Sequence, residues 1–242
     1  REVCRKAPAR CFFSSCILKL TGWSIMNLLF SSLFLVAGLF LCSSAPTHEE
    51  CQPLVTPLSM ADPSKIYGRV NVLMGYTDHD VFNHILKVTD SSWIKLSQSP
   101  LGPNEVLMTE ENKMNGRCFG SSVNITIDGN TLTTAPYLPS IANITSVFHV
   151  LPSCDDCLVL SVNTTASNLD QFVMLLNISS SVTHEEITVH SLYLMGREST
   201  VKDSDVEHFK KQASCHGFTK EPDFVYDTKK GFCTEGEGLK LV

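Results

Sequence analysis

The sequence predicts an all-β fold: an antiparallel barrel or a sandwich, with one helix packed outside it. Two observations support this class. Short runs rich in β-branched and aromatic residues follow one another at near-even spacing between residues 69 and 195. The pattern then changes to one helical segment and an irregular tail that contains Cys233. A series of strands followed by a single helix is typical of a sheet that closes or stacks on itself and is partly covered from outside.

The first strand is predicted over Arg69–Tyr76, because Val70, Val72, Met74 and Tyr76 alternate with other residues and so share one face. Seven further runs have the composition of strands: Trp93–Ser97, Val106–Thr109, Ser122–Asp128, Thr131–Ala135, Ile144–Leu151, Leu158–Thr164 and Glu186–Met195. The Asp-Gly-Asn turn at residues 128–130 indicates a hairpin. Consecutive strands are therefore expected to be antiparallel neighbours.

Two segments have helical spacing. Asp78–Val88 carries apolar residues at helical intervals, and an aspartate at its start can cap it. Ser204–Cys215 is amphipathic, with Phe209 and Ala213 on its inward face. The stretch 170–178 fits either a helix or a buried strand. Residues 46–66 are expected to be extended, because three prolines rule out a regular helix through them.

The N-terminal region predicts the compartment. Met26 is followed by the apolar run Leu28–Leu41 and then by small residues, which is the layout of a secretory signal peptide. We interpret residues 1–25 as a translated leader that is not native, residues 26–45 as the signal peptide, and residues 46–242 as one domain. An unusually long n-region and a signal anchor are the alternatives. No second apolar run of this length follows, so no membrane span is expected in the mature form.

The charge of residues 46–242 excludes one class of partner. Residues 1–45 hold five of the 19 basic residues and one of the 25 acidic ones, which leaves 14 basic against 24 acidic and a net charge of −10. An acidic domain of this kind is a poor binder of nucleic acid or of anionic membranes.

Six cysteines remain after residue 45: Cys51, Cys118, Cys154, Cys157, Cys215 and Cys233. An even number in an oxidising compartment predicts three disulfides and no free thiol, although six cysteines allow 15 pairings. Cys154 and Cys157 lie between two predicted strands and are expected to staple a hairpin turn. A thioredoxin-like redox pair is the alternative, but a strand rather than a helix follows it. No second Cys or His pair accompanies it, so no metal site is expected, and no cofactor.

Four Asn-x-Ser/Thr sequons predict N-glycosylation of several sites in a chain that carries a signal peptide. Their asparagines are Asn124, Asn143, Asn163 and Asn177. A glycosylated asparagine must face solvent, which constrains the outward face of each local strand.

The junction between the last strand and the helix points to a family. Tyr193–Ser199 reads YLMGRES and is followed by the helix that ends in Cys215. This resembles the closing motif of lipocalins, and Gly68 at the start of the first strand is similar to their opening motif. Val70 stands where the family has Trp, and the family's Thr-Asp-Tyr motif is absent. The chain therefore resembles divergent members.

Cysteine placement narrows the resemblance. The order of Cys51, Cys118, Cys215 and Cys233, the segment Asp223–Cys233 and the density of sequons are similar to the α1-acid glycoprotein (orosomucoid) branch. In that branch the first cysteine pairs with the third and the second with the fourth, which implies Cys51–Cys215 and Cys118–Cys233 here. Over Glu50–Cys233 the chain looks closest to fish members of this branch that bind saxitoxin and tetrodotoxin.

The resemblance implies an eight-stranded up-and-down antiparallel lipocalin β-barrel with one C-terminal α-helix packed outside and room for one small ligand. It also implies candidate residues. Ligand contacts are expected from Val72, Met74, Tyr76, Trp93 and Tyr193. Gly68 and Arg197 are expected to close the barrel, although the stack of the family's Trp on this arginine cannot form with Val70.

The predicted function is a secreted, extracellular (plasma) glycoprotein that carries a small molecule, such as a guanidinium toxin, without catalysis. An acute-phase, immune-modulating plasma glycoprotein that binds lipophiles is the alternative. A cationic ligand requires carboxylates or aromatic faces in the cavity, and the sequence does not place Glu110, Glu111, Asp78 or Asp80 there. A thiol enzyme is a third hypothesis, which the even cysteine count opposes. The sequence leaves the oligomeric state open.

Overall fold

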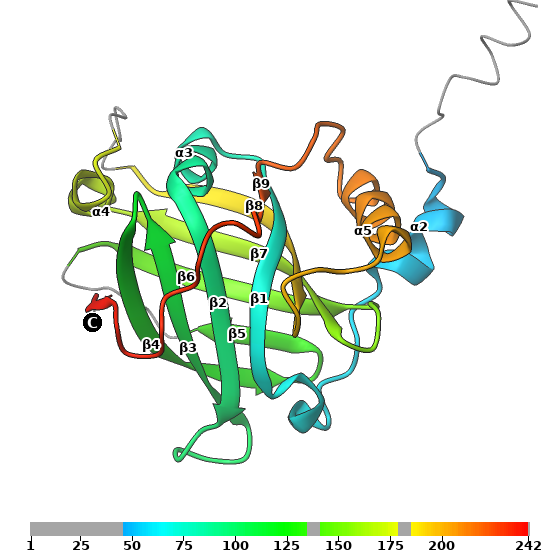
Figure 1. The fold of residues 1–242 in the computed structure, drawn as a ribbon. Coiled ribbons are helices and arrows are strands. Elements are labelled where there is room, and N and C mark those ends of the chain that lie inside the picture. The colour runs from blue at the N-terminus through cyan, green and yellow to red at the C-terminus, as the bar shows by residue number, and fades with distance from the viewer. Residues whose placement is uncertain (1–45, 135–140, 179–184, 242) are drawn as a thin grey trace, which may run out of the picture. The chain divides into compact units, whose positions relative to one another are not determined.

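A closed antiparallel barrel forms the body of the computed structural model, which describes residues 46–134, 141–178 and 185–241 (Figure 1). Its strands are β1 (Gly68–Thr77), β2 (Thr89–Gln98), β3 (Glu105–Met114), β4 (Arg117–Asp128), β5 (Thr131–Thr134), β6 (Asn143–Leu151), β7 (Cys157–Ser167) and β8 (Ile187–Gly196). Each strand pairs with the next, and β8 pairs with β1 to close the ring. The predicted eight-stranded barrel is confirmed, and the sandwich alternative is wrong because no edge separates two sheets.

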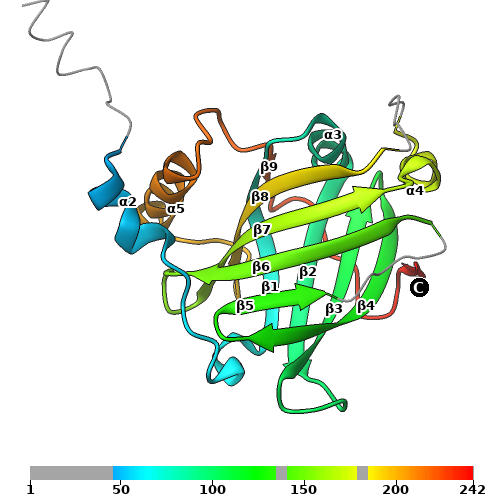
Figure 2. The ribbon, with the colours of Figure 1, turned by 180° about the vertical axis from the view of Figure 1, so that it is seen from behind.

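Two helices lie at the same end of the barrel (Figures 1 and 2). The α3 helix (Asp80–Val88) joins β1 to β2, and α4 (Asp170–Leu175) follows β7. Of the stretch 170–178, which fits either a helix or a strand by sequence, residues 170–175 are helical and residues 176–178 form a turn and coil, not a strand. His79 caps α3 by accepting a hydrogen bond from Val81 N, so the capping residue is not the expected aspartate. Both helices turn apolar side chains toward the barrel.

The C-terminal helix α5 (Asp203–Cys215) packs on the outside of the barrel, as expected. Phe209 and Ala213 are fully buried there against Tyr76 and residues of β8. The N-cap residue of α5 is Lys202, and its side chain makes no capping hydrogen bond. Burial of this apolar stripe therefore holds the helix in place more than its cap does.

The expectation of an extended segment before β1 is wrong in part. Residues His48–Val55 form helix α2, with Pro53 inside it, and Pro63–Ile66 form the 3₁₀ helix η1. Thr47 and Glu50 form a capping box at the start of α2, which satisfies two orphan N–H groups. The Cys51–Cys215 disulfide then fixes α2 to α5. Capping and this crosslink offset the one helical hydrogen bond that Pro53 cannot donate.

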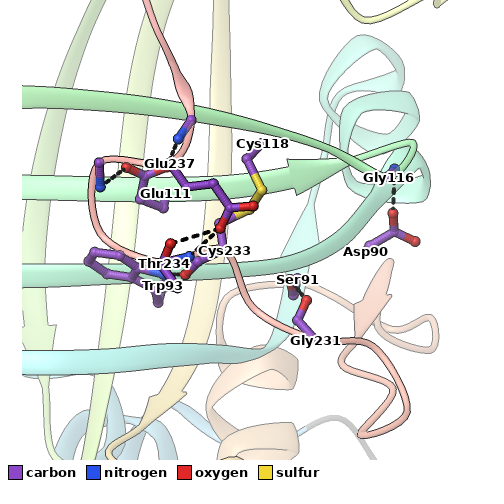
Figure 3. The surroundings of a disulfide bond; sticks show 12 residues. Asp90, Ser91, Trp93, Glu111, Gly116, Cys118, Gly231, Cys233, Thr234 and Glu237 are labelled. Carbon is purple, nitrogen blue, oxygen red and sulfur yellow. Dashed lines mark hydrogen bonds between the residues drawn. A yellow bond between two sulfur atoms is a disulfide. The ribbon is translucent and has the colours of Figure 1, made fainter.

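The C-terminal segment 230–241, here called the strap, crosses the outer face of β2, β3 and β4. The disulfide Cys118–Cys233 anchors it near its start (Figure 3). Its end forms β10 (Leu239–Lys240), parallel to β4, and an earlier part of the tail forms β9 (Phe224–Val225) beside β1. The strap therefore holds three strands from outside.

The expected leader (1–25) and signal peptide (26–45) lie outside the described residues. Among the described residues, no helix combines the length and the apolar character needed to cross a membrane.

Candidate functional site

The barrel interior holds a cavity of ≈ 210 Å³ below helices α3 and α4. Side chains from these helices close one end, and strands β1–β4 and β6–β8 form its wall. Most of the lining is apolar, and the polar residues in it are Thr89, Ser92, Glu110, Asn112, Ser146, Thr164 and Tyr193. Pockets for drug-sized ligands usually enclose roughly 300–1,000 Å³, so the cavity as it stands fits a small ligand.

Glu110 is the acidic residue of this cavity. It lies on β3 with Met108 and Asn112 on the same inward face, two residues apart each. Ser121 Oγ, on the neighbouring strand β4, donates a hydrogen bond of 2.7 Å to Glu110 Oε1. Burial raises the pKa of Glu110 above its usual range, although the hydrogen bonds from Ser121 and Asn112 favour the charged form. Among the described residues that line the cavity, Glu110 is the only one with a carboxylate.

Tyr193 brings a hydroxyl into the same cavity from β8. Its pKa is raised, first by burial, and the charge of Glu110 contributes in the same direction. Gly75 lies directly opposite Tyr193 in the pairing of β1 with β8. A Cβ atom at residue 75 would lie 2.9 Å from Tyr193 Cδ1, so the absence of a side chain there gives the ring its space.

The structure separates the five residues expected to contact a ligand. Val72 and Tyr193 line the cavity, whereas Met74 and Tyr76 pack outside the barrel against α5. The pairing of β1 with β8 shifts between Val72 and Met74, which marks a β-bulge at Leu73. One extra residue reverses the facing of every side chain after it. The expectation for Met74 and Tyr76 is therefore corrected: alternation from Val70 does not continue past Val72.

Trp93 is also outside the cavity, because the two neighbours that line it, Ser92 and Ile94, face inward on β2. Its ring is 1% exposed, under the strap, and its Nε1–H donates a 2.8 Å hydrogen bond to Cys233 O (Figure 3). The Arg69 guanidinium lies over this ring, 4.4 Å from its centroid. The expected ligand contact of Trp93 is therefore corrected: the residue has a structural position beneath the strap.

Gly68 and Arg197 meet at the opposite end of the barrel from α3. Arg197 Nη2 donates a 3.2 Å hydrogen bond to Tyr67 O, and a Cβ atom at residue 68 would lie 2.6 Å from Arg197 Nη1. Gly68 also has a φ of +112°, which favours glycine. Val70 is buried close by. Arg197 thus contacts the main chain at this end of the barrel. The stack on a Trp ring that the resemblance implies is replaced by this contact, because residue 70 is Val.

Sequence reasoning did not place Glu110 in the cavity. The predicted strand ended at Thr109, because the run 110–113 is polar and no longer looks like a strand. In the structure β3 continues to Met114, and Glu110 and Glu111 point to opposite faces. Glu111 accepts hydrogen bonds from Gly236 N and Gly238 N of the strap, outside the barrel. The alternation of Met108, Glu110, Asn112 and Met114 was the available signal.

The disulfides and sequons are placed as follows. Cysteines 51 and 215, 118 and 233, and 154 and 157 are bonded in the structure, which is the set of pairs expected from the sequence and the resemblance. Asn143, Asn163 and Asn177 are exposed and Asn124 is half-buried. Glycosylation of all four stays a prediction.

Solved structures share this fold. No protein-family model and no curated protein sequence matches the chain. The siderocalin Ex-FABP, described as having dual ligand specificities, is 13% identical, with a TM-score of 0.50 over 68% of this chain and 95% of that one. Lipocalin 12 from rat epididymis is 11% identical, with a TM-score of 0.51 over 73% and 90%. A second siderocalin, with a dual ligand binding mode, is 15% identical, with a TM-score of 0.50 over 73% and 97%. Together with the strand order and the outer helix, these likenesses show that the chain has the lipocalin fold.

Proposed function

We propose that the protein is a secreted glycoprotein that carries one small molecule in its barrel, and that Glu110 is the counter-ion of a positively charged group on that molecule. The observation that carries the proposal is a single carboxylate among the described lining residues of a mostly apolar cavity. A buried ionised acid is costly unless a cation or strong donors partner it. A ligand cation supplies that partner.

The ligand class we propose is a compact organic cation, such as a guanidinium toxin of the saxitoxin or tetrodotoxin kind. A planar guanidinium can give two parallel hydrogen bonds to one carboxylate. Asn112 and Tyr193 add polar contacts around Glu110, and the apolar wall excludes water. The resemblance to toxin-binding fish members of the orosomucoid branch supports the same class.

Secretion into plasma is part of the proposal. It rests on the signal-like segment 26–45, on the three disulfides, and on sequons whose asparagines are exposed or half-buried. No catalysis is proposed, since a carrier requires only binding and release.

A neutral lipophile, carried by an orosomucoid-like acute-phase protein, is the second candidate. The observation that favours it is the apolar majority of the lining, including Phe82, Phe148 and Phe172. For such a ligand Glu110 stays protonated, as its raised pKa permits.

Equilibrium dialysis of saxitoxin, tetrodotoxin, a fatty acid and a steroid separates the two candidates. A cation carrier binds a toxin saturably, and Glu110→Gln, which keeps the shape and removes the charge, weakens it by about 10–100-fold, the effect of losing a hydrogen bond to a charged group. Glu105→Gln, on the same strand but at the barrel's outer surface, leaves affinity unchanged. Binding of the lipophiles alone, with no effect of Glu110→Gln, contradicts the cation proposal and favours the second candidate.

A further inference from the structure

A second pocket, of ≈ 300 Å³, lies between the turn that joins β6 to β7 and the outer helix α5. It shares no residue with the barrel cavity. Cys154 and Cys157 line it from the turn, and Asp205, His208 and Gln212 line it from α5. The spacing of these three along the helix, three and four residues, places them on one face.

Three potential metal ligands converge in this pocket. The sulfur atoms of Cys154 and Cys157, which are bonded to each other in this structure, and a carboxylate oxygen of Asp205 all lie within 4.8 Å of one another. All three residues are half-buried, so the pocket is accessible to a small ion. Among the described residues, nothing pairs with the Asp205 carboxylate by hydrogen bond or ion pair.

One residue that lines the same pocket, Gln212, carries a buried acceptor without a partner in the described part of the chain. The side chain of Gln212 is fully buried, at 0% exposed. Its Nε2 donates hydrogen bonds of 2.8 Å to Leu54 O and to Pro152 O, which fixes the amide. Its Oε1 has no hydrogen-bond partner in the described part of the chain. A buried acceptor without a donor is uncommon, and an ordered water usually satisfies such a group in folded proteins.

We propose that Cys154 and Cys157, once reduced, form with Asp205 a site for one Zn²⁺ or a similar thiolate-binding divalent cation. Two thiolates and a carboxylate form a donor set that binds Zn²⁺ in preference to Ca²⁺ or Mg²⁺. These three residues leave the fourth position of a tetrahedral site to water. The site is closed in the oxidised protein, because a disulfide has no thiolate to offer.

The redox step balances with a thiol reductant. A dithiol passes two electrons and two protons to the Cys154–Cys157 disulfide and leaves as its own disulfide. Zn²⁺ then displaces the two thiol protons as it binds. This disulfide spans only 3 positions of sequence, against 164 and 115 for the other two. Since the stabilisation by a crosslink grows with the length of the closed loop, losing this one affects the fold least.

Cobalt absorption tests the site on the purified protein. The protein is reduced in steps, and differential alkylation with mass spectrometry identifies the step at which Cys154 and Cys157 alone are free. Co²⁺ added at that step is expected to give a thiolate-to-cobalt charge-transfer band at one ion per chain, and Zn²⁺ is expected to displace it. The oxidised protein and the double variant Cys154→Ser/Cys157→Ser are expected to give no band.

Two further variants test the role of the helix. Asp205→Asn is expected to weaken cobalt binding by at least about tenfold. Asp203→Asn, in the same first turn of α5 but outside the pocket, is the matched control and leaves affinity unchanged. Absence of a band in the selectively reduced protein overturns the proposal, as does equal binding by both variants. If reduction unfolds the chain, Cys154→His/Cys157→His presents two metal ligands without a reductant, and failure of that variant to bind Co²⁺ in an Asp205-dependent way also overturns it.

Discussion

The indole N–H of Trp93 donates a hydrogen bond to the main-chain carbonyl of Cys233, 140 residues later in the chain, at 2.8 Å. Two more side chains bind the same strap. Ser91 of β2 donates a hydrogen bond to Gly231 O, and Glu111 of β3 accepts hydrogen bonds from Gly236 N and Gly238 N. Cys233 is itself bonded to Cys118 on β4. Three adjacent strands therefore bind one segment through side chains that face away from the cavity.

This arrangement predicts that Trp93 reports on the strap and not on the cavity. Trp93 is the one tryptophan of residues 46–242, since the other is Trp23. Its fluorescence is expected to change little when a ligand fills the barrel and to shift strongly when the strap is released. Trp93→Phe removes the donor to a buried carbonyl and is expected to lower the free energy of unfolding by about 1–3 kcal/mol in urea titration. A large ligand-induced change in Trp93 emission with the strap still docked contradicts this placement.

Much of the barrel was predictable because the signals for it are local. Alternating side chains and turn residues indicate strands, and each strand contacts mainly its sequence neighbours. Facing was less predictable. The bulge after Val72 leaves no trace in the alternation of Val70, Val72, Met74 and Tyr76, so Met74 and Tyr76 were placed on the wrong side. For Trp93 a signal existed, because Lys95 and Ser97 share its face while Ile94 and Leu96 share the other.

The polar features were the least predictable from the sequence. Glu110 interrupts the apolar pattern by which a strand is recognised, so the residue that gives the cavity its charge also hides the strand that carries it. The pocket at Cys154 requires Asp205 from a helix 48 positions beyond Cys157, and no spacing rule joins the two. Helix α2 formed despite Pro53 because a capping box and a disulfide support it, and neither is visible in helix propensity.

At the closed end, Gly68→Ala is expected to destabilise the protein by about 1–3 kcal/mol, because φ of +112° is strained for any residue with a Cβ. Its Cβ would also displace Arg197 Nη1. Gly129→Ala, at a φ of +63° with open space around it, is the control for backbone strain alone. Thermal unfolding of Gly68→Ala, Arg197→Ala and the double variant forms a cycle. Strict additivity would show that Arg197 does not contact residue 68 in solution.

Acid is expected to destabilise the contact between α5 and the barrel through His216. Burial, and then the neighbouring His190, lowers the pKa of His216 from 6.5 to about 4. The rings of the two histidines lie 5.0 Å apart, and Phe218 stacks on His190. Because the folded-state pKa lies below the unfolded one, the unfolded chain binds the proton first as pH falls. Stability is therefore full above about pH 6.5 and decreases toward pH 4.

Melting temperatures at pH 7 and pH 4.5 measure this effect. His216→Gln cannot take up a proton, so the difference between the two temperatures is expected to become smaller than in the unaltered protein. His48→Gln, on exposed helix α2, is the matched control and keeps the full difference. If His216→Gln shows the same loss in acid as the control, another group causes it.

The contact between Gly75 and Tyr193 predicts a selective effect on binding. In Gly75→Ala the new methyl group requires the Tyr193 ring to move, because the Cβ would lie 2.9 Å from Cδ1 and 3.0 Å from Cε1. The ring lines the cavity beside Glu110, so a shift of a few tenths of an ångström changes its shape. Affinity for a cavity ligand is expected to fall about tenfold, equivalent to about 1.4 kcal/mol. Equilibrium dialysis measures it, with Gly102→Ala as the control, since nothing lies within 4 Å of a Cβ there.

Tyr193→Phe keeps the ring and removes the hydroxyl, so it separates the two contributions of this residue. An unchanged affinity in Gly75→Ala, with Tyr193→Phe impaired, would assign binding to the hydroxyl and leave the ring position without influence.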